Sequence, residues 1–254
     1  MRKTHCSNNG FSLTEVLLAI GIITVGMLFI AGVFPVGIHF TTIATERTIS
    51  AVVADEAFAK IRLYGIADFN SWSVPPVVAC VDYSVVSPLG ISPVDVEFSY
   101  PSDPNYDISR KQYYWSALCR QVDPDPNSRL VQVTVFVCRK VGSGTTYRGW
   151  AGNWPVPVPV AVSMGPGPKE LTITNLAEKT FINDGYTVVG NEYGRIYRVL
   201  ERYDDPVNDR TIRLDLDQAW GPGNMSPSVV WVVPPPIGGG RCPFMAIYQR
   251  VIRF

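Results

Sequence analysis

Residues 10–31 read GFSLTEVLLAIGIITVGMLFIA, a nearly uninterrupted apolar segment that begins at a glycine and contains one acid, Glu15. From Phe11 to Phe40 the chain runs for 30 residues without a Lys, Arg or Asp. About 20 consecutive apolar residues are enough for a helix to cross a bilayer. The segment therefore predicts a transmembrane helix whose membrane part covers about 11–40.

Basic residues lie on one side of this segment. Arg2 and Lys3 precede it, and the next basic residue is Arg47. Because basic residues favour the cytoplasmic side of a membrane, we expect the N-terminus in the cytoplasm and the rest of the chain to be exported. The apolar segment is too long for the apolar region of a secretory signal, and no small-residue cleavage site follows it. A processing signal is therefore expected before the apolar segment.

Glu15 is the residue that a simple anchor does not explain. A carboxylate deep in the bilayer costs about 2.5–3.5 kcal/mol on insertion scales, so such residues usually have a partner and a function. A positive group from another subunit offsets this cost only when the helices pack at the right axial offset. Glu15 is thus predicted to set the register of assembly. The alternative is an ordinary signal anchor in which Glu15 extends toward the head groups.

The N-terminus resembles the prepilin, or class III, signal of type IV pilins and type II secretion pseudopilins. The resemblance covers about 30 residues: Lys3 in a short leader, then the sequence GFSLTE from Gly10 to Glu15, then the apolar helix. It implies a leader peptide at 1–10 and cleavage by prepilin peptidase between Gly10 and Phe11. It also implies methylation of the Phe11 amine, which Glu15 of a neighbouring subunit would then bind.

The resemblance further implies a minor pilin or pseudopilin, similar to the PilV-like group, in a type IV pilus or a type II secretion filament. The expected location is the inner membrane, with one span and a periplasmic C-terminal domain, and later the filament. Expected partners are prepilin peptidase, other pilins or pseudopilins, the inner-membrane assembly platform and membrane lipid. The alternatives are a membrane-anchored periplasmic binding or enzymatic domain, and an adhesin at the filament tip.

Composition points away from several other functions. The chain of 254 residues has 22 basic and 22 acidic residues and a net charge of zero, so it has no basic excess that would favour nucleic acid, and no nucleic-acid partner is predicted. The two histidines, His5 and His39, lie in the leader and the apolar helix. Neither Ser/His/Asp nor Cys/His chemistry can be assembled in the exported part, which also lacks histidine ligands for zinc. We therefore expect no enzyme activity, no metal and no cofactor.

The cysteines leave the disulfide pattern open. Cys6 would leave with the leader, while four others lie on the exported side, where disulfides can form. These are Cys80, Cys119, Cys138 and Cys242. They allow three pairings, and sequence does not choose among them. Cys119 and Cys138 flank a turn and could face each other across a hairpin, but buried free thiols fit equally well.

The helix is expected to continue past the membrane. Apolar residues recur with helical spacing from Ile43 to Ile61, and Gly65 is expected to cap the helix after Tyr64. Pro35 is tolerated because membrane helices accept proline. The domain plan is one long helix at 11–65 whose amphipathic half packs on an antiparallel sheet, an α+β arrangement.

Two further regions are expected to be mainly β. A pilin-like α+β domain at 66–164 is built on a hairpin of 112–122 and 130–141, preceded by an alternating strand at Val94–Tyr100. The segment WPVPVPVAV after Asn153 has alternate prolines, which favour an edge position. Short strands with turn residues between them then predict a small C-terminal β lobe at 165–254, ending in a strand at 244–254.

Overall fold

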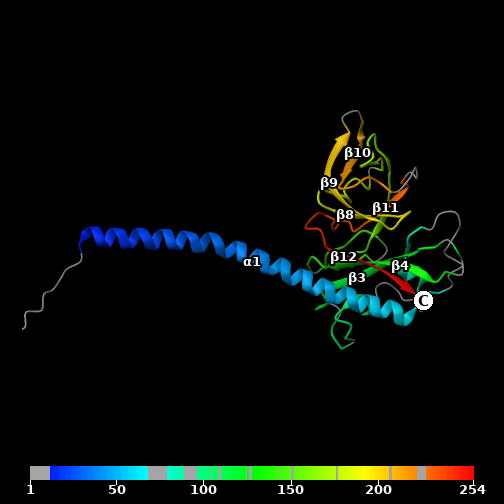
Figure 1. Ribbon diagram of the computed structural model, residues 1–254, viewed down its shortest axis with the longest axis horizontal. Coiled ribbons are helices and arrows are strands. Elements are labelled where there is room, and N and C mark those ends of the chain that lie inside the picture. The colour runs from blue at the N-terminus through cyan, green and yellow to red at the C-terminus, as the bar shows by residue number, and fades with distance from the viewer. Residues whose placement is uncertain are drawn as a thin grey trace, which may run out of the picture. The chain divides into compact units, whose positions relative to one another are not determined.

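The computed structural model describes the backbone of residues 12–67, 79–88, 96–103, 105–107, 110–123, 125, 128–142, 144–149, 152–175, 177–205, 208–221 and 227–254. It is an α+β structure with one long N-terminal helix and antiparallel sheets (Figure 1). The chain divides into two compact units, Met1–Thr48 and Ile49–Phe254. The helix belongs to the first unit as far as Thr48 and to the second unit beyond it, and both sheets belong to the second.

Helix α1 (Leu13–Tyr64) has 52 residues and continues through Pro35. At about 1.5 Å per residue it is about 78 Å long. It ends where the sequence predicts, because Gly65 takes a positive φ of 76° and its N–H donates to the Ile61 carbonyl at 3.0 Å. A side chain at this φ would be strained, so glycine is the natural residue to end the helix.

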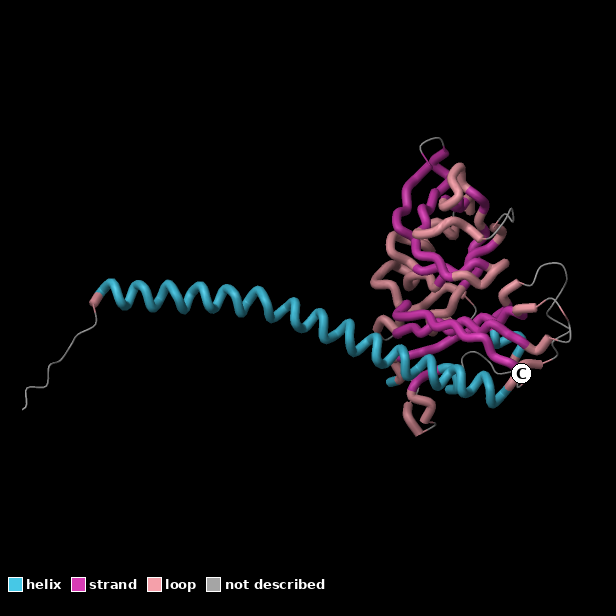
Figure 2. The backbone as a smooth tube through the Cα atoms, in the orientation of Figure 1, coloured by secondary structure: helices cyan, strands magenta, loops and turns pink. Residues whose placement is uncertain are grey.

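Sheet 1 belongs to the second unit and has five antiparallel strands, shown in magenta in Figure 2. Its strands are β1 (Val81–Asp82), β2 (Ser99–Tyr100), β3 (Tyr113–Gln121), β4 (Leu130–Arg139) and β12 (Phe244–Arg253). They follow the order β1-β3-β4-β12, and β2 also pairs with β3. The predicted hairpin is confirmed as β3 and β4, which pair from Tyr113–Arg139 to Gln121–Val131.

Sheet 2 has seven antiparallel strands in the order β5-β11-β8-β9-β10-β7-β6. They are β5 (Val158–Ala161), β6 (Ser163–Met164), β7 (Glu170–Ile173), β8 (Thr187–Gly190), β9 (Ile196–Asp205), β10 (Asn208–Leu216) and β11 (Val229–Val232). The proline-containing β5 lies at an edge, where the missing N–H group of Pro159 breaks no inner ladder. Two short helices, α3 (Tyr83–Val86) and η1 (Val96–Phe98), complete the described elements.

The residues of β3 and β4 are buried on both faces, which explains their almost continuous apolar sequence. On one face, Trp115 and Val135 join a core with Phe58 of α1. On the other face, Leu118 and Phe136 join a smaller core with Val189 of β8 in sheet 2. The period-2 alternation of side chains thus divides each strand between two cores. A third core lies within sheet 2.

Two sequence expectations differ from the strands observed. The final strand was assigned to the C-terminal lobe, but β12 pairs along its length with β4 of sheet 1, from Phe244–Cys138 to Arg253–Leu130. Sheet 2 therefore lies between two strands of sheet 1 in the sequence. In the alternating strand expected at Val94–Tyr100, the described residues form η1 followed by the short β2, and Val94 lies outside the described residues. The Glu97 carbonyl there accepts side-chain donors from Lys60 and Trp115 instead of a strand partner.

Candidate functional site

The start of α1 places Glu15 in a specific hydrogen-bonded turn. Its carboxylate Oε2 accepts a hydrogen bond from the Ser12 backbone N–H at 3.0 Å. The Ser12 hydroxyl in turn accepts the Thr14 backbone N–H at 3.3 Å. This arrangement is a variant of the capping box, in which the Ser12 hydroxyl accepts from Thr14 rather than from Glu15. It satisfies N–H groups at the helix start that have no partner within the helix. The spacing Ser-x-x-Glu in the sequence is the signal that could have predicted it.

The capping box fixes where the negative charge of Glu15 lies. The carboxylate is held at the positive end of the helix dipole, in the first turn. The bond to Ser12 uses one oxygen, so Oε1 is left for a second donor. Gly10 and Phe11, the predicted processing and methylation residues, lie outside the described residues, and those predictions stay predictions.

The first unit has an apolar surface that its own chain does not cover. Every residue from Ser12 to Thr42 is exposed, including Leu17 at 62% and Phe29 at 71%. This helix is long and apolar enough to cross a membrane. Contiguous apolar surface of this extent marks contact with lipid or with other protein.

Threonine hydroxyl groups in the apolar part of α1 find their acceptors within the helix. The hydroxyl groups of Thr24, Thr41 and Thr42 each donate to the carbonyl four residues earlier, at 2.7, 2.8 and 2.9 Å. An unsatisfied polar group in hydrocarbon would cost several kcal/mol, so these bonds suit an apolar environment. Glu15 is then the charged side chain of this segment for which an outside partner has to be sought.

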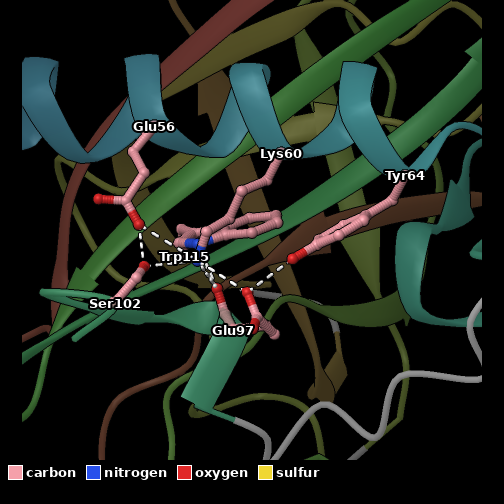
Figure 3. A network of polar contacts seen from close by, with 6 residues as sticks. All are labelled: Glu56, Lys60, Tyr64, Glu97, Ser102 and Trp115. Atoms are coloured by element: carbon pink, nitrogen blue, oxygen red, sulfur yellow. Dashed lines mark hydrogen bonds and ion pairs between the residues drawn. The ribbon is translucent and has the colours of Figure 1, made fainter. Parts of the chain in front are cut away.

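The second half of α1 carries a polar network that holds it to the segment before β3 (Figure 3). Lys60 Nζ lies 3.2 Å from Glu56 Oε1 and 3.1 Å from Glu97 Oε2, and it donates to the Glu97 carbonyl at 2.8 Å. Tyr64 donates to the Glu97 carboxylate at 2.9 Å. The hydroxyl of Ser102 accepts from Lys60 and donates to Glu56. One lysine therefore joins two acids and links α1 to the stretch 97–102.

This network shifts the titration of Glu97. Partial burial alone would raise the pKa of the Glu97 carboxyl, but hydrogen bonds from Lys60 and Tyr64 outweigh it and lower that pKa below its usual value. Burial and the acceptor Glu97 raise the pKa of the Tyr64 phenol. The network therefore favours an ionised Glu97 and a protonated Tyr64, which is the state that the hydrogen bonds require.

The folded state is expected to lose stability in acid through Glu97. The pKa of Glu97 is lower in the folded chain than its value of 4.5 in the unfolded chain. The ionised carboxylate therefore stabilises the fold above pH 4.5, and this stabilisation is lost as the pH falls through the lowered pKa of the folded chain. The expected result is a smaller fall in melting temperature below pH 4.5 for Glu97→Gln than for wild type, measured by circular dichroism. Glu201→Gln, on an exposed part of β9, is the control and should keep the wild-type pH dependence.

The four described cysteines are free thiols. The hairpin does not place Cys119 and Cys138 opposite each other, because Cys119 faces Val133 and Cys138 faces Tyr114. They also belong to the cores on opposite faces of sheet 1. Burial raises the pKa of Cys80 to about 12, and it raises the pKa values of Cys119 and Cys138 as well.

The four cysteines are expected to react with a thiol reagent at different rates in the folded chain. Cys242 is half-buried whereas the other three are buried, and the thiolate is the reactive form. With a maleimide reagent at pH 7, Cys242 is expected to react at least tenfold faster than Cys80, Cys119 or Cys138, as followed by peptide mass mapping. Equal labelling of all four in the native chain would contradict the burial of the other three.

No group of three or more His, Cys, Asp or Glu residues able to hold a metal ion occurs in the described part of the chain. The features that remain are the capped Glu15, the uncovered apolar half of α1 and the polar network around Lys60. No protein-family model, curated protein or solved structure matches this chain. Its function must therefore be inferred from its own residues.

Proposed function

We propose that this chain is a minor pilin or pseudopilin, a structural subunit of a type IV pilus or a type II secretion filament. The observation that carries the proposal is Glu15, the acid in an otherwise apolar helix, at the fifth position after Gly10. An isolated membrane anchor could use this acid only to cap the start of its own helix. A subunit that packs beside identical or related helices can use it to fix their axial offset.

The exposed apolar half of α1 supports assembly within a membrane and then within a filament. The helix crosses the inner membrane with Arg2 and Lys3 on the cytoplasmic side, and the second unit is periplasmic. During extension, contacts with neighbouring helices replace contacts with lipid. The partners in this account are prepilin peptidase, other pilins or pseudopilins and the inner-membrane assembly platform.

The role of Glu15 follows from its capping box. Cleavage after Gly10 makes Phe11 the first residue, so a new positive amine arises one residue before Ser12. The carboxylate already lies at the helix start, held by the Ser12 N–H. It then accepts the Phe11 amine of an adjacent subunit as a second donor. A charged pair in an apolar surrounding forms only in good geometry, so it selects one helix offset.

Sheet 2 favours a subunit of low copy number. It adds seven strands beyond the sheet that covers α1. A large domain on every subunit would crowd close helical packing, whereas a subunit at an end of the filament, or present in few copies, has room for it. The work of such a subunit is mechanical and includes no chemical step.

Processing can be tested directly. In cells that co-express the full-length chain with a prepilin peptidase, we expect a product shortened by ten residues, seen by mass spectrometry. Gly10→Leu is expected to block this cleavage, and the matched variant Ser12→Ala is expected to leave it intact. An uncut wild-type chain in the presence of a peptidase that cuts a control prepilin would contradict the proposal.

A further inference from the structure

A cavity in the second unit lies where β3 begins and β4 ends. Its volume is about 600 Å³. It is lined by Tyr106, Arg110, Lys111, Gln112, Arg139, Lys140, Gly142 and Gly144. The antiparallel pairing explains why two distant dipeptides meet here, because Tyr113 is opposite Arg139 and the Lys140 N–H donates to the Gln112 carbonyl at 2.7 Å. Arg110–Lys111 and Arg139–Lys140 are thereby brought to one place.

The cavity concentrates positive charge in a chain that has none overall. Of the eight described residues that line it, four are basic and none is acidic, whereas the whole chain carries 22 basic and 22 acidic residues. Like charges held together repel one another, and a bound anion would reduce that repulsion. A cavity lined by charge of one sign attracts ligands of the opposite sign.

Lys111 provides a second, independent observation. Its side chain is 1% exposed, and its Nζ is buried with no hydrogen-bond partner among the described residues. Burial and the nearby charge of Lys60 lower the pKa of Lys111, while the nearby carboxyl groups of Asp103, Glu56 and Glu97 act in the opposite direction. A buried ammonium without a hydrogen-bond acceptor is costly. A bound anion would reduce that cost.

Lys140 and the two glycines form the other side of the cavity, and a local contact limits the position of Lys140. Lys140 Nζ lies 4.9 Å from the centre of the Trp154 ring, and Trp154 is buried and stacks on Tyr114 at 5.1 Å. This contact limits the positions that the Lys140 side chain can take. Gly142 and Gly144 have φ values of 91° and 77°, and a Cβ at Gly144 would meet no atom within 4 Å. The glycines therefore leave their side of the cavity accessible.

We propose that this cavity binds a phosphate group, either free phosphate or the monoester of a small molecule. Arginine and lysine are the side chains that bind phosphate oxygens best, arginine through two parallel hydrogen bonds. Four cations match the nearly double negative charge of phosphate better than the single charge of a carboxylate. The volume falls within the range of about 300–1,000 Å³ typical of small-molecule sites. The inference does not depend on the filament proposal.

The test is a titration of the full-length chain in a neutral detergent at constant ionic strength set by sodium chloride. Inorganic phosphate is expected to raise the melting temperature saturably, because a ligand of the folded state stabilises it. Acetate at the same ionic strength is expected to bind with less than a tenth of the affinity of phosphate, as judged from the concentration dependence of the melting temperature. The same titration is carried out with glycerol 3-phosphate. If glycerol 3-phosphate binds more tightly than inorganic phosphate, the site is assigned to a phosphate monoester.

Two matched double variants distinguish binding in the cavity from a general effect of the net charge of the chain. Arg110→Gln with Lys140→Gln is expected to weaken phosphate binding at least tenfold. Arg62→Gln with Lys169→Gln changes the net charge equally at exposed positions outside the cavity and should bind as wild type does. Lys111→Met is expected to abolish the response to phosphate yet raise the melting temperature without phosphate, since it removes a buried charge.

Three results would overturn the proposal. They are no saturable response of the wild type to phosphate or glycerol 3-phosphate, equal weakening in both double variants, and wild-type phosphate binding by Lys111→Met. Binding of an oligonucleotide by a chain that ignores phosphate would likewise replace this site with a polyanion surface.

Discussion

Filaments from cells that express Glu15→Ala are expected to contain at least tenfold less of this chain than filaments from wild-type cells. Under the proposed function, the substitution removes the carboxylate that would accept the Phe11 amine of a neighbour, so the helices would lose the interaction that fixes their offset. Membrane insertion and removal of the leader should be unchanged, because the apolar segment and Gly10 are intact. The measurement is quantitative immunoblotting of sheared filaments and of membranes from the same cells.

The capping box makes a sharper comparison possible. Ser12→Ala removes the hydroxyl that caps the helix but leaves the charge of Glu15, whereas Glu15→Gln keeps an oxygen acceptor for the Ser12 N–H and removes the charge. If charge sets the register, Glu15→Gln fails to assemble like Glu15→Ala, and Ser12→Ala assembles normally. The reverse pattern, with Glu15→Gln assembling and Ser12→Ala failing, would mean that Glu15 serves only as a helix cap.

Trp115→Ala is expected to lower the free energy of unfolding of the second unit by about 3–5 kcal/mol, the usual cost of removing a large buried aromatic side chain. Trp115 is 1% exposed, and its ring lies 4.7 Å from Phe98 and 6.4 Å from Tyr83, centre to centre. Its Nε1 donates to the Glu97 carbonyl at 3.1 Å. The residue thus joins the core of sheet 1 to the polar network on α1. Urea unfolding of the full-length chain in detergent, followed by circular dichroism, measures the change.

Two further variants serve as controls for Trp115→Ala. Trp115→Phe keeps a buried ring and loses the hydrogen bond, and the Glu97 carbonyl still accepts from Lys60, so a loss of about 1 kcal/mol is expected. Leu200→Ala, at a site on β9 that is 53% exposed, should change stability by less than about 0.5 kcal/mol. Equal losses from Trp115→Ala and Leu200→Ala would contradict the packing described for Trp115.

Features set by local pattern could be predicted from the sequence. The long helix follows from its apolar run, its helical spacing and Gly65, and it ends at Tyr64 in the structure. The hairpin of β3 and β4 follows from two β-branched and aromatic runs joined by a short connection. The edge position of β5 follows from the alternate prolines in and before it, which have no backbone N–H to donate to a neighbouring strand. In each case the physical cause lies within a few residues.

Features that depend on distant pairing could not be predicted in this way. Nothing local in β12 says that it pairs with β4, which precedes it by about a hundred residues, because period-2 alternation shows a strand but does not choose its neighbour. Lys111 reads as a solvent-exposed residue at a strand start, yet it is buried. The basic cavity likewise requires the register that brings Arg110 near Lys140.

The capping box could have been predicted and was missed. Ser12 and Glu15 have the required spacing immediately before an apolar run, but Glu15 was interpreted by its charge alone. The two roles are compatible, since one carboxylate oxygen holds the helix start and the other can accept an amine. The variants Ser12→Ala and Glu15→Gln therefore test the two roles of Glu15 separately.

The most direct test of the filament account is the intact mass and N-terminal sequence of the chain recovered from native membranes and sheared filaments. The account predicts a chain that begins at Phe11 with a methylated amine and that is present in the filament fraction. A chain that begins at Met1 in cells with active prepilin peptidase would contradict it, and the protein would then be an anchored periplasmic domain.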